Sequence, residues 1–216
     1  LRRTAVFGAG AGGTALAQAF CNTHEESPWG RDRPHGEEIA HLRENRRYLP
    51  GVRLHDTLGI QGDFRAAAEQ ADLHLVVTPL AGLRETVRQL QRISPDTPLL
   101  WACKGFEAGT GRLPHEIITE ELGPEAPSGV LTGPSFAAEV GRGLPAAVTL
   151  AARDAAFAHH WVSVLHQPRL RIYANTDLVG CEVGGAVKNV MAIAAGVSDG
   201  MGFGLNARAA LITRGL

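Results

Sequence analysis

Short apolar segments alternate with amphipathic ones along residues 4–175 of this 216-residue chain. The segments "TAVFGAG", "DLHLVVTP", "TPLLWAC", "SGVLTG", "PAAVTLAA" and "RLRIYAN" have the composition of buried strands. Between them, apolar residues recur at helical spacing, as Leu83, Val87 and Leu90 do. Alternation of this kind is typical of an α/β fold with a doubly wound, mostly parallel sheet.

The pattern changes after Asn175 to helix only, beginning with "TDLVGCEVGGAVKNVMAIAAGVSDG". We therefore predict a domain boundary at this point. Residues 1–175 would form the α/β domain, and residues 176–216 would begin an all-helical domain. Because residues 184–193 are small or apolar at nearly every position, this helix is predicted to be buried.

The segment "FGAGAGGTALA" places Gly8, Gly10 and Gly13 at the junction of the first strand and the first helix. In a GxGxxG loop the first glycine makes the tight turn, the second lets the backbone approach a pyrophosphate, and the third lets strand and helix pack closely. The helix amino terminus then presents free amides and its positive dipole end to the phosphates. This context predicts a Rossmann-type dinucleotide-binding domain.

The adenosine end of such a site is less well defined by the sequence. The second strand is expected in "EESPWGRD", which is polar and contains Pro28, a poor residue for an interior strand. Asp32, 19 residues after Gly13, is placed to bond ribose hydroxyls, whereas Arg31 would meet a 2′-phosphate. Both residues also fit a role as surface loop charges, so NAD and NADP stay open as cofactors.

Composition and charge exclude several classes of function. The 21 basic and 22 acidic residues leave a net charge of −1, which argues against an extended nucleic-acid or membrane surface. Cys21, Cys103 and Cys181 lie far apart, which favours free thiols in a reducing compartment, with the cytoplasm as the default. The histidines lack metal-ligand spacing, so no metal site is expected. No continuous apolar run approaches the length of a membrane span, and "LRRTAVFGAG" begins a strand instead of a signal peptide.

Further polar residues follow other expected strands. Lys104 comes just after "TPLLWAC", and Gly133 and Ser135 stand where "SGVLTG" gives way to a helix. Taken singly, Lys104 fits a solvated loop and Ser135 fits a helix N-cap. Because the carboxyl ends of parallel strands share one edge, we expect these residues to converge on one crevice that suits a phosphorylated or otherwise anionic substrate.

Lys188 stands in the middle of the apolar segment "GGAVKNVMAI". Its stem can pack while its ammonium group reaches water, or the lysine can be held at a site where its charge is used. Helical spacing places Gly184, Gly185, Ala192 and Ala195 on its face, so that it would stand in a groove of small residues. Apolar surroundings there would favour its neutral form.

Five segments in order, "GAGAGGTALA", "NRRYLP", "WACKGFEAGTGRL", "GPSFAAEVGRGLP" and "GGAVKNVMAIAAGVSDGMGFGLNARAALITRGL", resemble the bacterial NAD(P)-dependent glycerol-3-phosphate dehydrogenases over essentially the whole chain. The resemblance implies reversible hydride transfer between NAD(P)H and dihydroxyacetone phosphate, giving sn-glycerol 3-phosphate for phospholipid synthesis. It implies that Lys188 is the catalytic proton acceptor, which also touches substrate together with Lys104, Gly133 and Ser135. The implied cofactor contacts are Gly8, Gly10, Ala11, Gly12, Gly13, Arg31, Lys104 and Ala137.

Members of that family continue with further helices, so we expect the sequence to stop inside the second domain and to turn over substrate poorly by itself. Two alternatives remain open at this point. One is another Rossmann dehydrogenase that acts on hydroxy acids, sugar acids or opines. The other is a non-catalytic nucleotide-binding module that forms a homodimer through the helix at 184–197.

Overall fold

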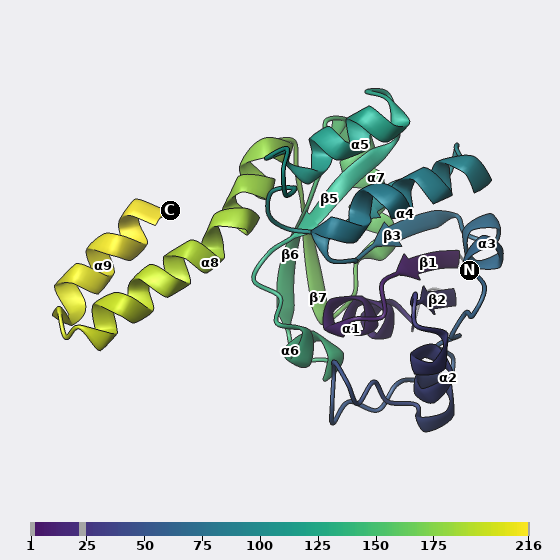
Figure 1. Ribbon diagram of the computed structural model, residues 1–216, viewed down its shortest axis with the longest axis horizontal. Helices are drawn as coiled ribbons and strands as arrows, with labels where there is room; N and C mark the ends of the chain where they lie inside the picture. Colours follow the sequence, from purple (N-terminus) through teal and green to yellow (C-terminus); the bar gives the residue numbers. More distant parts are fainter. Residues whose placement is uncertain (1–2, 22–24, 216) are drawn as a thin grey trace.

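The computed structural model describes residues 3–21 and 25–215, and within them one sheet has the strand order β2-β1-β3-β4-β5-β6-β7 (Figure 1). All neighbouring strands pair in parallel except β5 and β6, which are antiparallel. The strands are β1 (Arg3–Phe7), β2 (Glu25–Trp29), β3 (Leu73–Val76), β4 (Leu99–Trp101), β5 (Ser128–Thr132), β6 (Ala146–Ala151) and β7 (Leu170–Asn175). The helices are α1 (Ala11–Phe20), α2 (Arg33–Leu42), α3 (Phe64–Glu69), α4 (Leu80–Ile93), α5 (Pro114–Leu122), α6 (Ala137–Gly141), α7 (Ala155–Leu165), α8 (Leu178–Gly200) and α9 (Gly204–Gly215).

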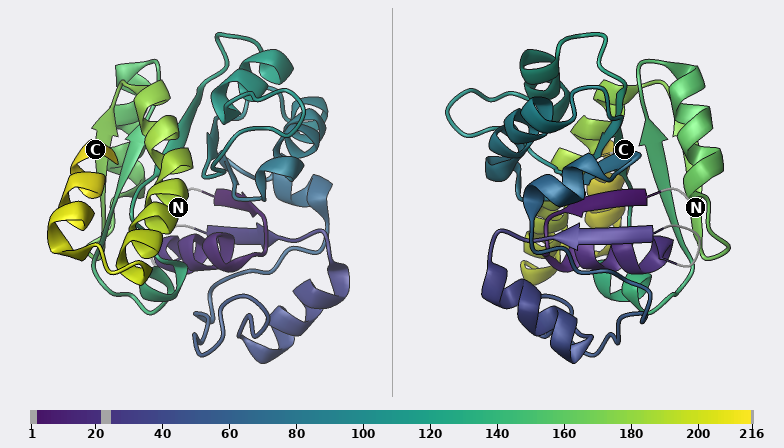
Figure 2. Two further views of the ribbon diagram at one scale, coloured as in Figure 1. Left: turned by 60° about the vertical axis from the view of Figure 1, so that its left-hand side comes forward. Right: turned by 90° about the vertical axis from the view of Figure 1, so that its right-hand side faces the viewer.

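The central strands are apolar on both faces because helices cover both. In β4, Leu100 belongs to the core beneath α1 and α7, whereas Leu99 and Trp101 belong to the core beneath α3, α4 and α5. The two views of Figure 2 show these helix layers on opposite sides of the sheet. Near-continuous apolar strands are therefore required here, in place of the polar–apolar alternation of a half-exposed sheet.

The architecture confirms the predicted doubly wound, mostly parallel fold, and the strands lie where the apolar segments place them. Two helices, α2 and α3, lie in the polar stretch between β2 and β3, for which the pattern made no prediction. The polar second strand is β2, and it lies at the edge of the sheet, paired only with β1. An edge position explains why a strand containing Pro28 is tolerated.

The prediction that residues 184–193 form a buried helix is wrong for the residues the structure describes. Helix α9 folds back against α8, and α8 itself extends away from the sheet (Figure 1). Its buried residues are Leu178, Glu182 and Ser198, whereas Val190 and Ile193 are 62% and 68% exposed. A helix that is apolar on all sides is suited to burial, but it is buried only where another segment packs against it.

Helix α8 is the segment that bears on the expectation that no continuous apolar run approaches the length of a membrane span. Its 23 residues are long and apolar enough to cross a membrane by length and composition, and the described part of the chain holds this one such helix. A single helix of this kind is weak evidence for membrane insertion, because core helices pass the same test. Glu182, Lys188 and Asp199 lie within it.

Candidate functional site

The strand order reverses between β1 and β3, because the chain passes from β1 to β2 on one side and then returns to β3 on the other. In open α/β sheets, ligands bind in the crevice outside the carboxyl ends of the strands at such a point. The glycine loop follows β1, Thr78 follows β3, Lys104 follows β4 and Gly133 follows β5. The parallel strands therefore bring these segments to one edge.

Packing requires glycine at two positions of the glycine loop and leaves space for a side chain at a third. Gly8 has φ +131°, and a Cβ there would lie 2.6 Å from the Val77 carbonyl oxygen. A Cβ on Gly13 would lie 1.8 Å from the Gly8 carbonyl oxygen, so α1 approaches β1 only because this residue has no side chain. A Cβ on Gly10 would meet no heavy atom of another described segment within 4 Å. Gly10 therefore leaves space above the backbone for a ligand.

The amino end of α1 fits a phosphate group. Gly10 is its N-cap and provides no side-chain cap bond, and no acidic residue occupies the first turn. The amides of Ala11 and Gly12 therefore face the open space beside Gly10 together with the positive end of the helix dipole. This arrangement suits the pyrophosphate of a dinucleotide.

Asn45 is a residue that the sequence reasoning missed. It is fully buried, and its Nδ2 donates hydrogen bonds to the Ala9 carbonyl oxygen at 2.9 Å and to the Thr14 Oγ1 at 2.8 Å. Its Oδ1 accepts from the Tyr48 amide at 3.2 Å. Asn45 thus ties the glycine loop to the segment after α2. The segment "NRRYLP" contains it, but no spacing rule links it to a loop 36 residues away.

A cavity of about 110 Å³ lies beside the start of α1 and collects several predicted residues. The residues expected from the sequence that line it are Gly12, Lys104, Ser135 and Ala137. Gly133 is adjacent, because its carbonyl oxygen accepts a hydrogen bond from Lys104 Nζ at 3.4 Å. Ser135 does not cap α6, whose N-cap is Phe136. The structure therefore brings the predicted strand-end residues to one crevice.

Lys104 and Lys188 meet at the side of this crevice. The two side chains interact, and Gly185 lets α8 come close, since a Cβ there would lie 3.0 Å from Thr132 Oγ1 and 3.7 Å from Lys104 Cγ. Neither lysine forms an ion pair with a carboxylate of the described residues. They are also the only lysines in the sequence, in which all other basic side chains except histidine are arginine. An uncompensated pair of ammonium groups favours an anion between them.

The sequence predicted apolar surroundings for Lys188, but the lysine that is partly buried is Lys104. Lys188 is exposed in the described part of the chain, whereas Lys104 is half-buried. Burial of Lys104, with the nearby Lys188 charge acting in the same direction, lowers the pKa of Lys104 to about 8. Of the residues expected on the Lys188 face, Gly185 contacts the sheet, while Gly184 faces open space. Asp199, near the end of α8, pairs with Arg208 of α9, with 3.3 Å between Oδ2 and Nη1.

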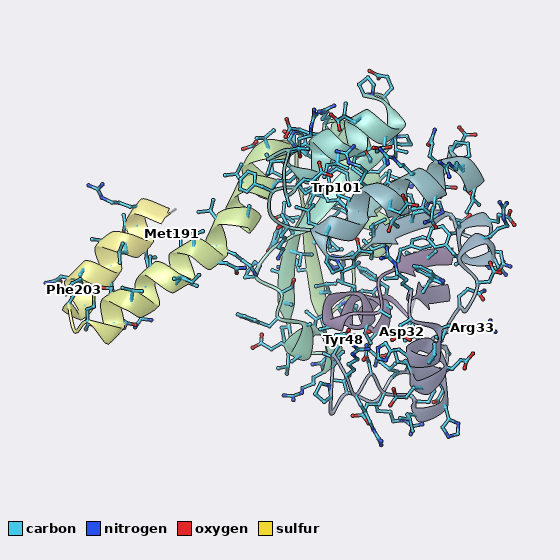
Figure 3. The ribbon with its side chains drawn as sticks, viewed as in Figure 1. Asp32, Arg33, Tyr48, Trp101, Met191 and Phe203 are labelled. Atoms are coloured by element: carbon cyan, nitrogen blue, oxygen red, sulfur yellow. The ribbon has the colours of Figure 1, made fainter. Side chains whose placement is uncertain are left out.

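At the adenosine end, Asp32 is engaged in local structure. Its Oδ1 accepts the His35 amide at 3.2 Å as the N-cap of α2, and its Oδ2 lies 3.3 Å from Arg47 Nη1. Figure 3 shows Asp32 and Arg33 at the start of α2. Arg31 is exposed beside them and does not line the cavity that holds Lys104. Asp32 is thus fixed by its cap and ion pair, whereas no ion pair is found for the exposed Arg31 side chain among the described residues.

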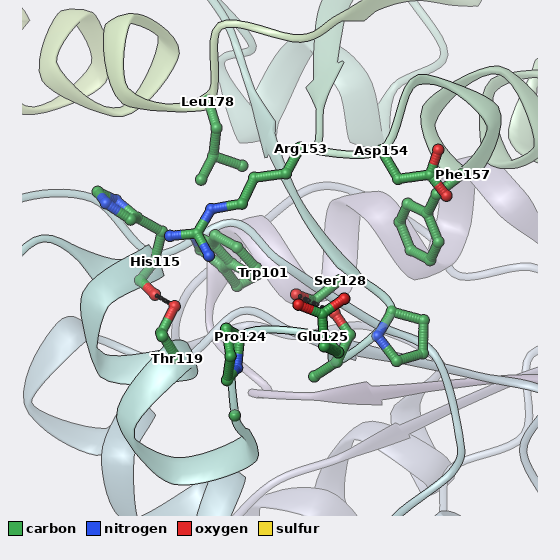
Figure 4. Close-up of a pocket in the computed structure, with 13 residues that line it drawn as sticks. Trp101, His115, Thr119, Pro124, Glu125, Ser128, Arg153, Asp154, Phe157 and Leu178 are labelled. Atoms are coloured by element: carbon green, nitrogen blue, oxygen red, sulfur yellow. Dashed lines mark hydrogen bonds between the residues drawn. The ribbon is translucent and has the colours of Figure 1, made fainter.

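A second cavity, of about 220 Å³, lies among α5, α7 and the start of α8 (Figure 4). Arg153, Phe157, His115 and Trp101 are among the residues that line it. None of the residues predicted from the sequence to contact substrate or cofactor lines it. The predicted chemistry therefore belongs to the crevice at the strand ends.

Comparisons with known proteins agree with this geometry. Residues 3–158 match the family described as NAD-dependent glycerol-3-phosphate dehydrogenase N-terminus, and residues 177–216 match the one described as NAD-dependent glycerol-3-phosphate dehydrogenase C-terminus. This chain belongs to the NAD-dependent glycerol-3-phosphate dehydrogenase family. The resemblance seen in its five segments is thereby confirmed.

Two curated members of the family align along nearly the whole chain. The glycerol-3-phosphate dehydrogenase [NAD(P)+] of Aromatoleum aromaticum is 71% identical over 99% of this chain and 65% of its own length. That of Dechloromonas aromatica is 54% identical over 98% of this chain and 64% of its own length. The chain thus spans slightly less than two thirds of the length of these relatives.

Solved structures of the family share the fold. The crystal structure of glycerol-3-phosphate dehydrogenase from Coxiella burnetii superimposes with a TM-score of 0.90 at 39% identity, covering 99% of this chain and 66% of that one. The Saccharomyces cerevisiae glycerol-3-phosphate dehydrogenase superimposes with a TM-score of 0.83 at 27% identity, covering 99% and 67%.

Substituting the open glycine separates ligand binding from folding. We expect Gly10→Val to abolish binding of NADH and NADPH while the far-ultraviolet circular dichroism and melting temperature stay close to wild type, because its backbone conformation suits any residue and the new side chain meets solvent. Fluorescence titration measures the affinity. The control, Gly13→Ala, should lose the fold itself, because its methyl group meets the Gly8 carbonyl. Unchanged nucleotide affinity in Gly10→Val would show that the glycine loop does not bind the nucleotide.

The lowered pKa of Lys104 predicts a specific titration. Below pH 8 this lysine is charged in both the folded and the unfolded state, so the full cost of burying it is present. As the pH rises from about 8 toward the ordinary lysine value of 10.5, the folded state loses the proton first and this cost is relieved. Carbon-13 NMR of reductively methylated lysines should show one resonance that titrates near pH 8 and is absent from Lys104→Arg. A Lys104 resonance that titrates near 10.5 would contradict the described burial.

Proposed function

We propose that the full-length protein carrying this sequence is an NAD(P)-dependent glycerol-3-phosphate dehydrogenase, which interconverts dihydroxyacetone phosphate and sn-glycerol 3-phosphate for phospholipid synthesis. The observation that carries the proposal is the pair of lysines, Lys104 and Lys188, which meet without a carboxylate partner among the described residues at the crevice that the glycine loop enters. A phosphorylated substrate supplies the anion that this pair lacks. Membership of the family supports the same reaction.

The residues of the crevice divide the work of holding the ligands. Gly10, Ala11 and Gly12 would hold the cofactor pyrophosphate at the start of α1, with Gly8 and Gly13 shaping the loop. Ala137 and Lys104 would contact the nicotinamide end, and Arg31 the adenosine ribose. Gly133, Ser135 and Lys104 would hold the substrate near Lys188. The bound nicotinamide would supply or accept the hydride.

Lys188 would carry the proton in this reaction. When the substrate carbonyl is reduced, negative charge develops on its oxygen, and an ammonium group beside that oxygen stabilises the charge and then donates a proton. In the oxidation direction the neutral amine accepts the hydroxyl proton. Lys104, half-buried beside it with a pKa of about 8, would hold the substrate by charge and by hydrogen bonding.

Three further features of the whole protein belong to this proposal. Residues 1–175 would form the cofactor domain, and residues 176–216 the first part of a helical substrate domain. The exposed apolar side chains of α8, of α9 and of the turn between them (Val190, Ile193, Val197, Phe203 and Leu205) would then be covered by further helices or by a second subunit in a homodimer. Cys21, Cys103 and Cys181 lie far apart in the sequence, which favours a reducing compartment, and we propose the cytoplasm.

The direct test is an assay of the full-length protein. NADH or NADPH oxidation should be rapid with dihydroxyacetone phosphate and negligible with pyruvate or ketopantoate, which lack the phosphate that the lysine pair would bind. Comparable rates with a phosphate-free substrate would favour a different dehydrogenase. Nucleotide binding without turnover of any of these compounds would favour a binding module.

Replacement of Lys188 should affect the chemical step. In the full-length protein we expect Lys188→Met to keep nucleotide affinity but to lower kcat by roughly 10²-fold to 10⁴-fold, or about 3–5 kcal/mol of transition-state stabilisation. Stopped-flow measurement of hydride transfer locates the loss. Asn189→Ala, at the neighbouring exposed position, is the matched control. Hydride transfer at the wild-type rate in Lys188→Met would return this lysine to a structural role.

If Arg31 binds the 2′-phosphate of NADPH, it sets the preference of the protein for NADPH over NADH. We expect Arg31→Gln to weaken NADPH binding much more than NADH binding, because only NADPH carries the phosphate that a guanidinium binds. Titration of both nucleotides measures the difference. Arg33→Gln is the control, since Arg33 is also exposed but pairs with Glu37 at 3.1 Å. Equal losses for both cofactors in Arg31→Gln would exclude this role.

A further inference from the structure

Glu182 is a buried carboxylate that attaches α8 to the sheet domain. It is 4% exposed and lies in the second turn of α8. Its Oε1 accepts hydrogen bonds from Trp101 Nε1 at 2.7 Å and from the His115 amide at 3.0 Å. Its Oε2 lies 2.5 Å from His115 Nδ1. One side chain thus binds donors on both β4 and α5.

The anchor and the two lysines are close together along both segments. Glu182 and Lys188 lie on the same helix, six residues apart, which is about 9 Å along its axis. Lys104 lies three residues beyond Trp101, just after β4. Because Lys188 interacts with Lys104, the bond between Glu182 and Trp101 fixes the part of α8 from which Lys188 reaches Lys104.

Gly185 completes this arrangement halfway between the anchor and the lysine. A methyl group at this position would lie 3.0 Å from Thr132 Oγ1, so the helix touches the end of β5 there. Beyond this point α8 leaves the sheet, and Val190 and Ile193 are exposed. The placement of Lys188 therefore depends on contacts at the start of the helix.

We propose that Glu182 is a positioning residue, whose hydrogen bonds to Trp101 and His115 set the register of α8 and thereby hold Lys188 against Lys104. The inference rests on the proposed function for its catalytic consequence. Apolar contacts of Leu178 also hold the start of α8, but apolar packing is not directional. Donors on two separate elements fix both the translation and the rotation of the helix. These hydrogen bonds also offset the free-energy cost of burying a carboxylate.

The test compares side chains at position 182 in the full-length protein. Glu182→Gln keeps the length and an oxygen that accepts from Trp101, and its amide group can donate to His115. Glu182→Leu removes every one of these bonds. Leu178→Ala is the matched control, because it weakens the attachment of the same helix end without touching the hydrogen bonds.

Two readouts are measured on the folded fraction of each variant. The first is kcat for dihydroxyacetone phosphate reduction, with nucleotide affinity measured alongside. The second is the titration of Lys104 by NMR, which needs no activity: the charge of Lys188 contributes to the lowered pKa of Lys104, so this pKa should rise when Lys188 moves away. Lys188→Met provides the reference for complete loss of that contribution.

We expect Glu182→Leu to lower kcat by roughly 10-fold to 10²-fold at unchanged nucleotide affinity and to move the Lys104 titration toward that of Lys188→Met. Glu182→Gln and Leu178→Ala should stay near wild type in both readouts. If Glu182→Leu does not fold, Glu182→Asp replaces it, since a carboxylate shorter by one methylene group cannot reach both donors and should raise the Lys104 pKa.

A wild-type kcat and a wild-type Lys104 titration in the folded leucine or aspartate variant would overturn the proposal. So would equal effects in Leu178→Ala, because these would show a general loosening of α8. If the wild-type protein does not reduce dihydroxyacetone phosphate, the proposed function fails, whereas the Lys104 titration still decides whether Glu182 positions Lys188.

Discussion

Burial of both faces of the parallel strands is the constraint on which the rest of this structure depends. Leu100 packs beneath α1 and α7 while its neighbours Leu99 and Trp101 pack beneath the opposite helix layer. Parallel strands need crossover connections, and these deliver every strand from β1 to β5 with its carboxyl end at the same edge. The glycine loop, Lys104 and Gly133 come together for this reason, although more than 90 residues separate the first from the second.

Helix α1 approaches β1 closely because glycine, which has no side chain, stands at the point of contact. Gly13 lies where any side chain would strike the Gly8 carbonyl, and Asn45 holds the loop from the other side through Ala9. The helix amino end is thereby fixed, uncapped and open. Helix α8 is held differently, by polar contacts instead of close backbone packing. Glu182 bonds to Trp101 and His115 at the start of the helix, and the remaining length is mostly exposed.

The placement of charge is equally selective. Arg84 is paired with Glu107 and Glu121, and Arg88 is paired with Glu121. The hydrogen bonds from Arg84 and Thr110 hold the pKa of Glu107 at about 2. By contrast, the two lysines face each other without a carboxylate among the described residues, and burial lowers the pKa of Lys104. Arginine forms the permanent ion pairs, whereas lysine, whose pKa shifts more readily on burial, stands at the proposed site of proton transfer.

The strand positions, the glycine loop and the convergence of Lys104, Gly133 and Ser135 were predictable from the sequence, because hydrophobic periodicity and glycine spacing are local properties of the chain. Local patterns do not report which surfaces meet. The sequence therefore could not show that α8 leaves the sheet, that Lys104 instead of Lys188 is the half-buried lysine, or that Asn45 and Glu182 hold the loop and the helix. These features depend on contacts between segments 36 and 81 residues apart, and only the tertiary structure decides which donors such side chains meet.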